Sequence, residues 1–269
     1  MSIPYAEVIG DPIAHSKSPL IHKFWLEKLG IEADYRATQI GPNELSEYVA
    51  ARRLDPNWLG CNVTMPHKLS ISAHLDHLNP HARRIGAVNV VMRYEDELVG
   101  LNTDWQGINL ALPFEAAKGK DVVLIGAGGA GRAAMEELRM AGPKFLTLLN
   151  RDEAKARELL RHFAIEGTAG PLAAGIPPAD LLINASALGM SGFPKLEVDL
   201  SLLRRAAVVM DMVYTPLETK LLQQARDKGL RAIDGLSMLI WQAAMAFRLF
   251  FRAGCEEPDS EELRALLTR

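Results

Sequence analysis

The feature that most constrains the fold is a glycine-rich turn between an apolar run and a helical pattern. In DVVLIGAGGAGRAAMEEL (residues 121–138), Gly126, Gly128 and Gly131 directly follow a run that predicts a strand. In such a turn the first glycine permits a tight bend, the second lets the backbone approach a pyrophosphate, and the third lets helix and strand pack closely. The start of the helix then faces the phosphates with unpaired N–H groups and its positive dipole end. The pattern therefore predicts a strand–turn–helix unit that binds a dinucleotide.

The rest of the chain alternates short apolar runs with helical patterns, which is typical of α/β layers. With 269 residues it exceeds what one small core usually organises, so two domains are expected. The N-terminal part predicts strands at 5–10, 33–40 and 58–63, helices at 19–29 and 42–53, and a hairpin over 87–102. In the first of these helices, the side chains available for burial are Leu20, Phe24 and Leu26 or Leu29.

A second unit begins after Gly119. It predicts strands at 121–125, 144–151, 180–186 and 206–214, and helices after the glycine turn and at 152–163. The segment 167–180 is expected to be a loop with one short strand, and the C-terminal end is expected to be helical. The predicted fold is two-domain α/β, with an N-terminal α/β substrate domain and a Rossmann-type doubly wound nucleotide-binding domain. The first spans 1–103 and is completed by helices at 237–269; the second spans 104–236.

Composition excludes several kinds of partner. A net charge of -3 gives no electrostatic reason to expect nucleic acid or a membrane surface. The N-terminus lacks the pattern of a signal peptide, and the apolar segment 236–251 is interrupted by Gln242 and Arg248. Cys61 and Cys255 have no spacing that indicates a disulfide framework or a metal site. A reducing, cytoplasmic setting is the simplest inference.

The end of the strand after the glycine turn indicates which nucleotide is bound. NAD sites commonly place Asp or Glu there, whereas NADP sites use Arg for the 2′-phosphate. Here the chain has Asn150 and Arg151, and Lys155 adds a positive charge one helical turn further on. Asp152 opposes them, although Asp is also well suited to cap the start of the following helix. The pattern favours NADP and leaves NAD open.

Polar side chains gather at strand ends of the first domain. CNVTMPHK (61–68) leads from an apolar run to Thr64 and Lys68, GDPIAHSKSPLIHK (10–23) offers Ser16 and Ser18, and GLNTDWQG (100–107) contains Asp104. Such a set of groups suits the binding of a polyhydroxylated small molecule. Taken singly, Lys68 also fits a solvated lysine at a helix start, and one of the serines fits a helix cap.

The sequence resembles the shikimate dehydrogenase family over essentially its whole length. The resemblance is carried, in chain order, by GDPIAHSKSPLIH, GCNVTMPHK, IGAVNVV, GLNTDWQG, GAGGAGRAA, NASALGM, MDMVYTPLETKLL and IDGLSMLIWQAAMAF. It implies an oxidoreductase that reversibly interconverts 3-dehydroshikimate and shikimate with NADP, by hydride transfer at C3, in aromatic amino-acid biosynthesis. Some relatives take quinate, and some take NAD.

The resemblance also implies roles for particular residues. Lys68 and Asp104 become the catalytic pair, in which a lysine beside a carboxylate relays the hydroxyl proton and stabilises a developing oxyanion. The substrate-binding residues would be Ser16, Ser18, Thr64, Asn89, Tyr214 and Gln242. The cofactor-binding residues would be Gly126, Ala127, Gly128, Gly129, Ala130, Gly131, Asn150, Arg151, Asp152, Lys155, Ser186, Met212 and Gly235.

The chain departs from the family pattern at three positions. Trp105 and Gln106 follow Asp104 where the pattern has Gly-x, so the tryptophan is expected to narrow the pocket or change the domain junction. Val90 replaces a threonine near the substrate, and Asp152 stands where a threonine often touches the 2′-phosphate. Because of these changes, the alternative interpretation is a quinate/shikimate dehydrogenase paralogue that uses NAD or either cofactor.

Other interpretations are weaker. A methylenetetrahydrofolate dehydrogenase also pairs a lysine with a Rossmann unit, but it lacks the serine pair and the Asn-Thr-Asp motif. A nonenzymatic nucleotide sensor has no need of Lys68 and Asp104. His74, His77 and His81 resemble a metal cluster, yet Pro80 interrupts the helix they would share, so no metal is expected. The chain is expected to be a monomer or a homodimer.

Overall fold

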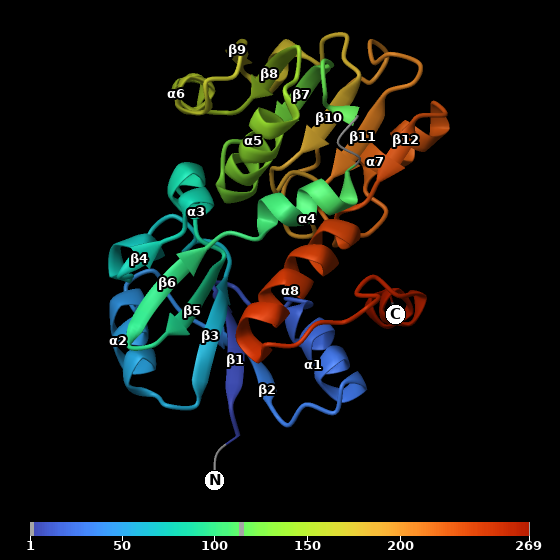
Figure 1. Cartoon of the computed structure of the whole chain (residues 1–269). Helices are drawn as coiled ribbons and strands as arrows, with labels where there is room; N and C mark the ends of the chain where they lie inside the picture. The colour runs from blue at the N-terminus through green and yellow to red at the C-terminus, as the bar shows by residue number, and fades with distance from the viewer. Residues whose placement is uncertain (1–2, 113–115, 269) are drawn as a thin grey trace. The chain divides into compact units, whose positions relative to one another are not determined.

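The computed structural model describes residues 3–112 and 116–268 of the chain (Figure 1). It divides into two compact units, Met1–Thr103 with Ile240–Arg269 and Asp104–Leu239. The boundary near the C-terminus lies inside the long helix α8 (Gly235–Phe251), at Ile240, whereas the sequence pattern placed it at residue 237. The hydrophobic pattern of a helix continues unchanged across a domain boundary, so the sequence does not show where inside α8 the boundary lies.

The first unit is built on a mixed sheet with the strand order β2-β1-β3-β5-β6-β4. Strand β1 pairs in parallel with β2 and β3, and β5 runs antiparallel to β3 and β6. The strands are β1 (Tyr5–Gly10), β2 (Asp34–Gln39), β3 (Trp58–Val63), β4 (His77–Leu78), β5 (Val90–Tyr94) and β6 (Glu97–Leu101). The three predicted strands and the hairpin are confirmed, while the two-residue β4 is too short to leave a periodic pattern.

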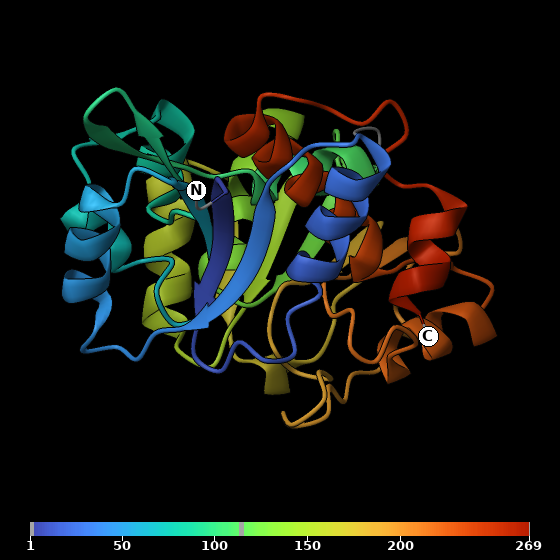
Figure 2. The same ribbon diagram turned by 90° about the horizontal axis from the view of Figure 1, so that it is seen from below.

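Helices cover both faces of this sheet. Figure 2 shows α1 (Ser18–Lys28) and α2 (Leu45–Leu54) on opposite sides of β1 and β2. One face packs on side chains of α2, of the 3-10 turn Ile71–His74 and of α3 (Pro80–Ile85). On α1 the buried residues include His22 and Trp25, and their rings contact Phe247 of α8. The last helix is α9 (Glu261–Leu267).

The predicted buried face of α1 is correct only in part. Leu20 and Leu29 are exposed, and of the predicted set Leu26 is the residue that is buried. The helix turns His22 inward instead, where its ring stacks on Tyr35 with 3.9 Å between ring centroids. Burial lowers the pKa of His22 to about 3, so the ring is neutral and packs as an aromatic side chain. A hydrophobicity pattern counts histidine as polar and therefore misses this face.

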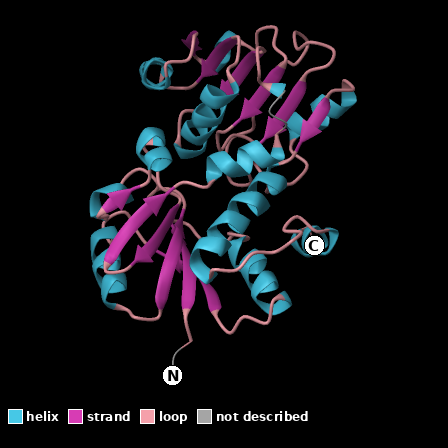
Figure 3. Cartoon of the chain, in the orientation of Figure 1, coloured by secondary structure: helices cyan, strands magenta, loops and turns pink. Residues whose placement is uncertain are grey.

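The second unit is built on a parallel sheet with the order β12-β11-β10-β7-β8-β9. Its strands are β7 (Asp121–Ile125), β8 (Phe145–Leu149), β9 (Gly167–Gly170), β10 (Leu181–Asn184), β11 (Val208–Asp211) and β12 (Arg231–Ile233). Its helices are α4 (Asp104–Ala111), α5 (Gly129–Ala141), α6 (Glu153–Phe163) and α7 (Lys220–Asp227), with a 3-10 turn at Leu172–Ala174. Figure 3 shows these strands flanked by the helices.

The alternation of side chains along these strands produces two apolar layers. Val122 and Leu124 point to the side covered by α4, α5 and α6, whereas Val123 and Ile125 point to the side covered by α7. Both faces are buried, so the strands have continuous apolar runs, as expected for a parallel sheet. The predicted doubly wound architecture is confirmed. The short β12, α4 and α7 were missed, because they are shorter than the stretches over which a hydrophobic period is counted.

Within the described residues, no helix is both long and apolar enough to cross a membrane.

One buried carboxyl group in the second unit gives a prediction about stability. Glu137 on α5 is 3% exposed; its Oε1 accepts a hydrogen bond of 2.8 Å from Asn109, and its Oε2 has no partner among the described residues. Burial raises the pKa of Glu137, and the neighbouring Glu136 raises it further. The folded protein therefore binds this proton more tightly than the unfolded chain. The resulting stability is present at low pH and is lost as the pH rises through the folded-state pKa.

Glu137→Gln should therefore raise the melting temperature at pH 7 by about 2–4 °C, because it removes the buried charge and keeps the shape. The gain should vanish near pH 4, where the carboxyl group is already protonated. Scanning calorimetry at the two pH values checks this, with Glu166→Gln, an exposed carboxylate of the same unit, as control. A variant less stable than wild type at pH 7 would contradict the expectation.

Candidate functional site

The strand ends of the second unit lie in one row. Pairing aligns Asn184 with Asp211 and with Ile125, and Ile125 in turn with Leu149. These are the last residues of β10, β11, β7 and β8. The segments that follow them therefore leave the same edge of the sheet, which is where open α/β sheets bind their ligands.

The three motif glycines have different surroundings. Gly126 has φ +104°, a conformation that side chains rarely adopt, and an added Cβ would lie 3.0 Å from the Ala185 carbonyl. A Cβ on Gly131 would lie 2.2 Å from the Gly126 oxygen, so helix and turn pack without room for a side chain. Gly128 is exposed, and a Cβ there would meet no atom of the described residues within 4 Å.

This turn fits the diphosphate of a dinucleotide. Gly128 precedes α5, whose first residues Gly129, Ala130 and Gly131 offer backbone N–H groups and no bulky side chain. Open space beside the second glycine is what the approach of a pyrophosphate requires, and the helix dipole favours the negative charge. Ala127 between the first two glycines is buried and packs in the core of the unit.

The end of β8 carries the groups predicted to choose the nucleotide. Arg151 is exposed, and Asn150 donates a 2.9 Å hydrogen bond from its amide to the Asp152 carbonyl. Asp152 is the N-cap of α6, and its Oδ1 accepts a 3.1 Å hydrogen bond from the Lys155 backbone. The carboxylate is therefore engaged with the helix start, as the capping interpretation expected, and Arg151 remains exposed at the edge of the sheet.

The loops after β10 and β11 contain Ser186, Met212 and Tyr214, and α8 begins at Gly235. Ser186 is held by Asn184: its backbone N–H and its hydroxyl donate to Asn184 Oδ1 over 3.1 and 2.7 Å. A Cβ on Gly235 would lie 2.4 Å from the Met212 oxygen, so a larger residue would not fit there. Burial raises the pKa of Tyr214, which keeps its phenol protonated at neutral pH.

In the first unit, the loops that carry the serines and the lysine pack against each other. The Asp11 N–H donates a 3.0 Å hydrogen bond to the Met65 carbonyl, and an added Cβ on Gly10 would lie 2.5 Å from the Thr64 methyl group. The Ser16 hydroxyl accepts a 3.3 Å hydrogen bond from the Ser18 N–H, at the start of α1. The structure therefore brings the segments of Ser16 and Thr64 to one edge of the sheet.

Lys68 is positioned by its neighbour His67. The buried His67 ring shares a 2.6 Å hydrogen bond with the Ile40 carbonyl, and its backbone N–H donates to the Thr64 carbonyl. The Lys68 carbonyl accepts a 2.8 Å hydrogen bond from the Val88 N–H, and the residue is half-buried. These contacts hold the backbone at Lys68. The anchoring role of His67 was not predicted.

Asn89 is the centre of a buried polar network in the same unit. Its Oδ1 accepts from the Thr103 N–H over 2.7 Å, and its Nδ2 donates to the Gln242 Oε1 over 3.3 Å. The Thr103 hydroxyl donates a 3.0 Å hydrogen bond to the Gln242 carbonyl. Because a backbone N–H can only donate, the Thr103 contact fixes the orientation of the Asn89 amide. Two predicted substrate residues, Asn89 and Gln242, are thus joined directly.

Sequence reasoning missed two members of this network. Asn62, near the end of β3, donates a 3.3 Å hydrogen bond to the Asn89 carbonyl and accepts one of 2.6 Å from the Tyr35 phenol. Both side chains are buried. An asparagine inside an otherwise apolar strand was the available signal, because a buried amide needs partners.

Asp104 is the first residue of α4 and of the second unit, and it is 3% exposed. Trp105 packs against the core of that unit, beside α5 and the parallel sheet. Val90 is fully buried at the start of β5, where it pairs with Asn62 and Leu101.

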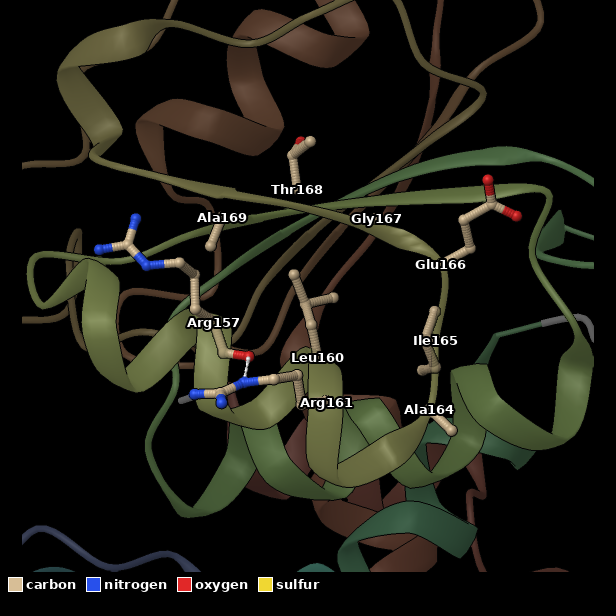
Figure 4. A pocket seen from close by; sticks show the side chains of 9 residues that line it. All are labelled: Arg157, Leu160, Arg161, Ala164, Ile165, Glu166, Gly167, Thr168 and Ala169. Carbon is tan, nitrogen blue, oxygen red and sulfur yellow. Dashed lines mark hydrogen bonds between the residues drawn. The ribbon is translucent and has the colours of Figure 1, made fainter.

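Two further features lie away from these residues. Figure 4 shows a groove of about 720 Å³ between the end of α6 and β9, flanked by Arg157 and Arg161, and no predicted site residue is among the described residues that line it. The imidazole of His77 lies 3.0 Å from the Glu97 carboxylate at the surface. In residues 3–112 and 116–268, no group of three His, Cys, Asp or Glu side chains is arranged to hold a metal ion.

Two family models match the chain: shikimate dehydrogenase substrate binding domain over residues 8–91 and shikimate / quinate 5-dehydrogenase over residues 110–210. A shikimate dehydrogenase (NADP(+)) of Sphingopyxis alaskensis is 49% identical over 265 residues, which cover 98% of this chain and 97% of the relative.

Two solved structures extend the comparison. Shikimate 5-dehydrogenase from Thermus thermophilus, in complex with NADP(H) and shikimate, has a TM-score of 0.88 and 36% identity, over 98% of this chain and 100% of that one. A 5-ketofructose reductase of Gluconobacter has a TM-score of 0.88 and 28% identity, over 100% of this chain and 98% of that one.

The glycine geometry gives a prediction with an internal control. Gly128→Ala should leave the melting temperature nearly unchanged, because its Cβ meets no atom of the described residues, yet weaken NADPH binding by about tenfold, because it occupies the space of the diphosphate. Gly131→Ala should instead lower the melting temperature by about 2–10 °C, because its Cβ collides with backbone. Calorimetry and NADPH fluorescence titration separate the two effects. Equal loss of affinity without destabilisation in both variants would contradict this assignment.

Proposed function

Because the chain belongs to the shikimate dehydrogenase family, we propose that it interconverts 3-dehydroshikimate and shikimate, with NADP as its cofactor. The chain is an oxidoreductase with a Rossmann-type nucleotide-binding domain, and aromatic amino-acid biosynthesis is the pathway of its relatives' reaction. The observation that carries the proposal is the near-complete coverage of an NADP-dependent relative at 49% identity. Predicted polar groups also follow directly after strands in both units, as Thr64 follows β3 and Asn150 follows β8, which supports the proposal.

We assign substrate binding to Ser16, Ser18, Thr64, Asn89, Tyr214 and Gln242. Hydroxyl and amide groups both donate and accept hydrogen bonds, as a polyhydroxylated ring with a carboxylate requires. The Asn89–Thr103–Gln242 network supports this assignment, because it holds two of these amides in one orientation before any ligand arrives. Preorganised groups lose less entropy on binding than mobile ones.

We assign the proton transfer to Lys68 and Asp104. When bound, the nicotinamide would supply the hydride transfer at C3, and the chain's own residues would have to remove or return the proton at the C3 oxygen. The Lys68 amine is suited to hold that oxygen and to stabilise negative charge as it develops there, and the Asp104 carboxylate is suited to pass the proton onward. The His67 anchor supports the role of Lys68, because it restricts the loop on which the amine is carried.

We assign the choice of NADP to Arg151, with a smaller contribution from Lys155. The guanidinium presents paired donors that suit a 2′-phosphate. Asp152 would oppose this group if its carboxylate pointed at the phosphate, but it accepts from the α6 backbone instead. The engaged carboxylate therefore supports a net preference for NADP, reduced by the charge that remains nearby.

Related substrates are the main alternative. The similarity to a 5-ketofructose reductase indicates that this fold also serves another carbonyl substrate, and quinate differs from shikimate mainly by added water across the ring double bond. We place the enzyme in the cytoplasm as a monomer or homodimer, and the two free cysteines support a reducing compartment. The deciding experiment measures kcat/KM for the oxidation of shikimate and quinate with NADP and NAD, and for the reduction of 5-ketofructose with NADPH and NADH, by the change in absorbance at the NADPH wavelength. No turnover of shikimate with either cofactor would refute the proposal.

Lys68→Ala should lower kcat by at least about a hundredfold, because it removes the proton-transfer group, while NADPH still binds. Steady-state kinetics and NADPH titration on the same preparation measure the two quantities. Lys23→Ala is a suitable control, because Lys23 is an exposed lysine of the same unit that pairs with Asp34. Turnover within a few-fold of wild type would remove Lys68 from the mechanism.

Cofactor choice gives a second prediction. Arg151→Ala should reduce the ratio of kcat/KM for NADP to that for NAD by about tenfold, because a charge-assisted contact to the phosphate is lost. Asp152→Thr should raise the ratio, since threonine still caps α6 and carries no charge. The control is Arg157→Ala, an exposed arginine further along the same helix that pairs with Glu153. A ratio unchanged in both test variants would contradict the assignment.

A further inference from the structure

A buried polar pair joins the ends of two neighbouring strands in the nucleotide-binding unit. Asn184 ends β10 and Asp211 ends β11; they are paired in register, and both are fully buried. The Asn184 Nδ2 donates a 2.9 Å hydrogen bond to the Asp211 Oδ1. Neither residue was among the predicted site residues, and neither takes part in the proposed proton transfer.

The orientation of the Asn184 amide is fixed by its partners. Its Nδ2 also donates to the Leu188 carbonyl over 3.1 Å, and a carbonyl can only accept. Its Oδ1 accepts from the Ser186 N–H and hydroxyl. The amide thus donates two hydrogen bonds and accepts two. These bonds attach the loop 185–188 to the end of β10. Every one of these bonds depends on the amide keeping this orientation.

Asp211 supplies the charge that holds this arrangement. Besides Asn184, its Oδ1 accepts a 3.1 Å hydrogen bond from the Val213 N–H, and its Oδ2 accepts one of 2.7 Å from the Thr219 hydroxyl. Burial raises the pKa of Asp211 above its usual value, and the hydrogen bonds from Thr219, Val213 and Asn184 offset only part of that rise. An ionised carboxylate only accepts hydrogen bonds, so it matches three donors without conflict.

The pair acts on the backbone around four residues predicted to bind the cofactor. Asn184 holds Ser186, and the adjoining Ala185 lies against Gly126, whose Cβ position is 3.0 Å from the Ala185 carbonyl. Asp211 holds Val213, directly after Met212. A Cβ on Gly235 would in turn lie 2.4 Å from the Met212 oxygen and 2.8 Å from the Val213 oxygen. The conformation of the loops after β10 and β11 is therefore fixed by one hydrogen-bonded pair, Asn184 and Asp211.

The strand order assigns these loops to one half of the cofactor. In the order β12-β11-β10-β7-β8-β9, the glycine turn follows β7 and Arg151 follows β8. In doubly wound folds the dinucleotide lies across the edge of the sheet, with one mononucleotide over each half. If Arg151 binds the 2′-phosphate as proposed, the adenosine part lies over the β7-β8-β9 half. The β10-β11-β12 half is left for the nicotinamide part.

We propose that Asp211, acting through Asn184 and Val213, is a positioning residue for the nicotinamide half of the cofactor. The proposal rests on the proposed function, because it presupposes that the chain binds NADP. It predicts that loss of the Asp211 carboxylate weakens recognition of the nicotinamide half and leaves recognition of the adenosine half intact.

The test compares two probes on the full chain. NADPH spans both halves of the site, whereas adenosine 2′,5′-bisphosphate carries only the adenosine and its phosphate groups. Asp211→Asn keeps the size of the side chain but removes its charge and turns one acceptor into a donor. We expect the Kd for NADPH to rise by about tenfold, and the Kd for adenosine 2′,5′-bisphosphate to stay within about twofold, by isothermal titration calorimetry.

A matched control is available at the opposite edge of the same sheet. Asp180 precedes β10, where its carboxylate lies 2.6 Å from the Arg204 guanidinium and accepts a 3.0 Å hydrogen bond from the Asp121 N–H. Asp180→Asn removes a carboxylate from the same unit, at the other end of the strand from the proposed cofactor edge. Both probes should bind this variant as they bind wild type.

The outcomes separate positioning from general loss of structure. Equal weakening of both probes, or unchanged affinity for NADPH, overturns the proposal. If Asp211→Asn yields no folded protein, Thr219→Val decides: it removes one donor to Asp211, keeps the Asn184 bond, and should weaken NADPH alone by a smaller factor. A wild-type protein that binds neither probe would refute the proposed function itself, which distinguishes that failure from failure of the Asp211 role.

Discussion

A buried asparagine amide organises the strand ends in each of the two units. Asn89 binds the Thr103 backbone and the Gln242 side chain, and Asn184 binds Ser186, Leu188 and Asp211. At a strand end the backbone N–H and C=O groups no longer pair with a neighbouring strand, so they need other hydrogen-bond partners when they are buried. An amide that both donates and accepts can join two such segments. The loops that carry the proposed site residues depend on these contacts.

The same principle explains how charge is used in the second unit. The Asp211 carboxylate lies among donors in the interior, whereas Asp152 caps an exposed helix start and leaves Arg151 at the edge of the sheet. A buried charge is costly unless hydrogen bonds compensate it. The Asp211 charge therefore serves to hold loops in place, while the arginine at the surface is available for a ligand phosphate. The surroundings of an ionisable group decide whether it binds a ligand or holds neighbouring segments of the protein in place.

Much of the fold and site could be predicted from local pattern. The glycine turn, the hairpin and most of the strands left clear signals, and the motif segments indicated the family and its reaction. The buried face of α1 was predicted only in part: Leu26 is buried, but the burial of His22, which packs as a neutral aromatic ring on Tyr35, was missed. The short elements α4, α7 and β12 were missed. Asn62, Asn184 and Asp211 were also missed, although each is a polar residue at or near the end of an apolar strand.

The sequence by itself determined the strand–turn–helix unit, because Gly126 permits a backbone conformation and Gly131 a close packing contact that other residues do not. It also determined which chemical groups are present at the strand ends. Only the tertiary structure decided which of those groups meet. Asn184 and Asp211 are 27 residues apart in the chain, and they bond because the register of a parallel sheet aligns the two strand ends. Register is set by the packing of whole strands and helices, so it cannot be read from either residue's neighbours.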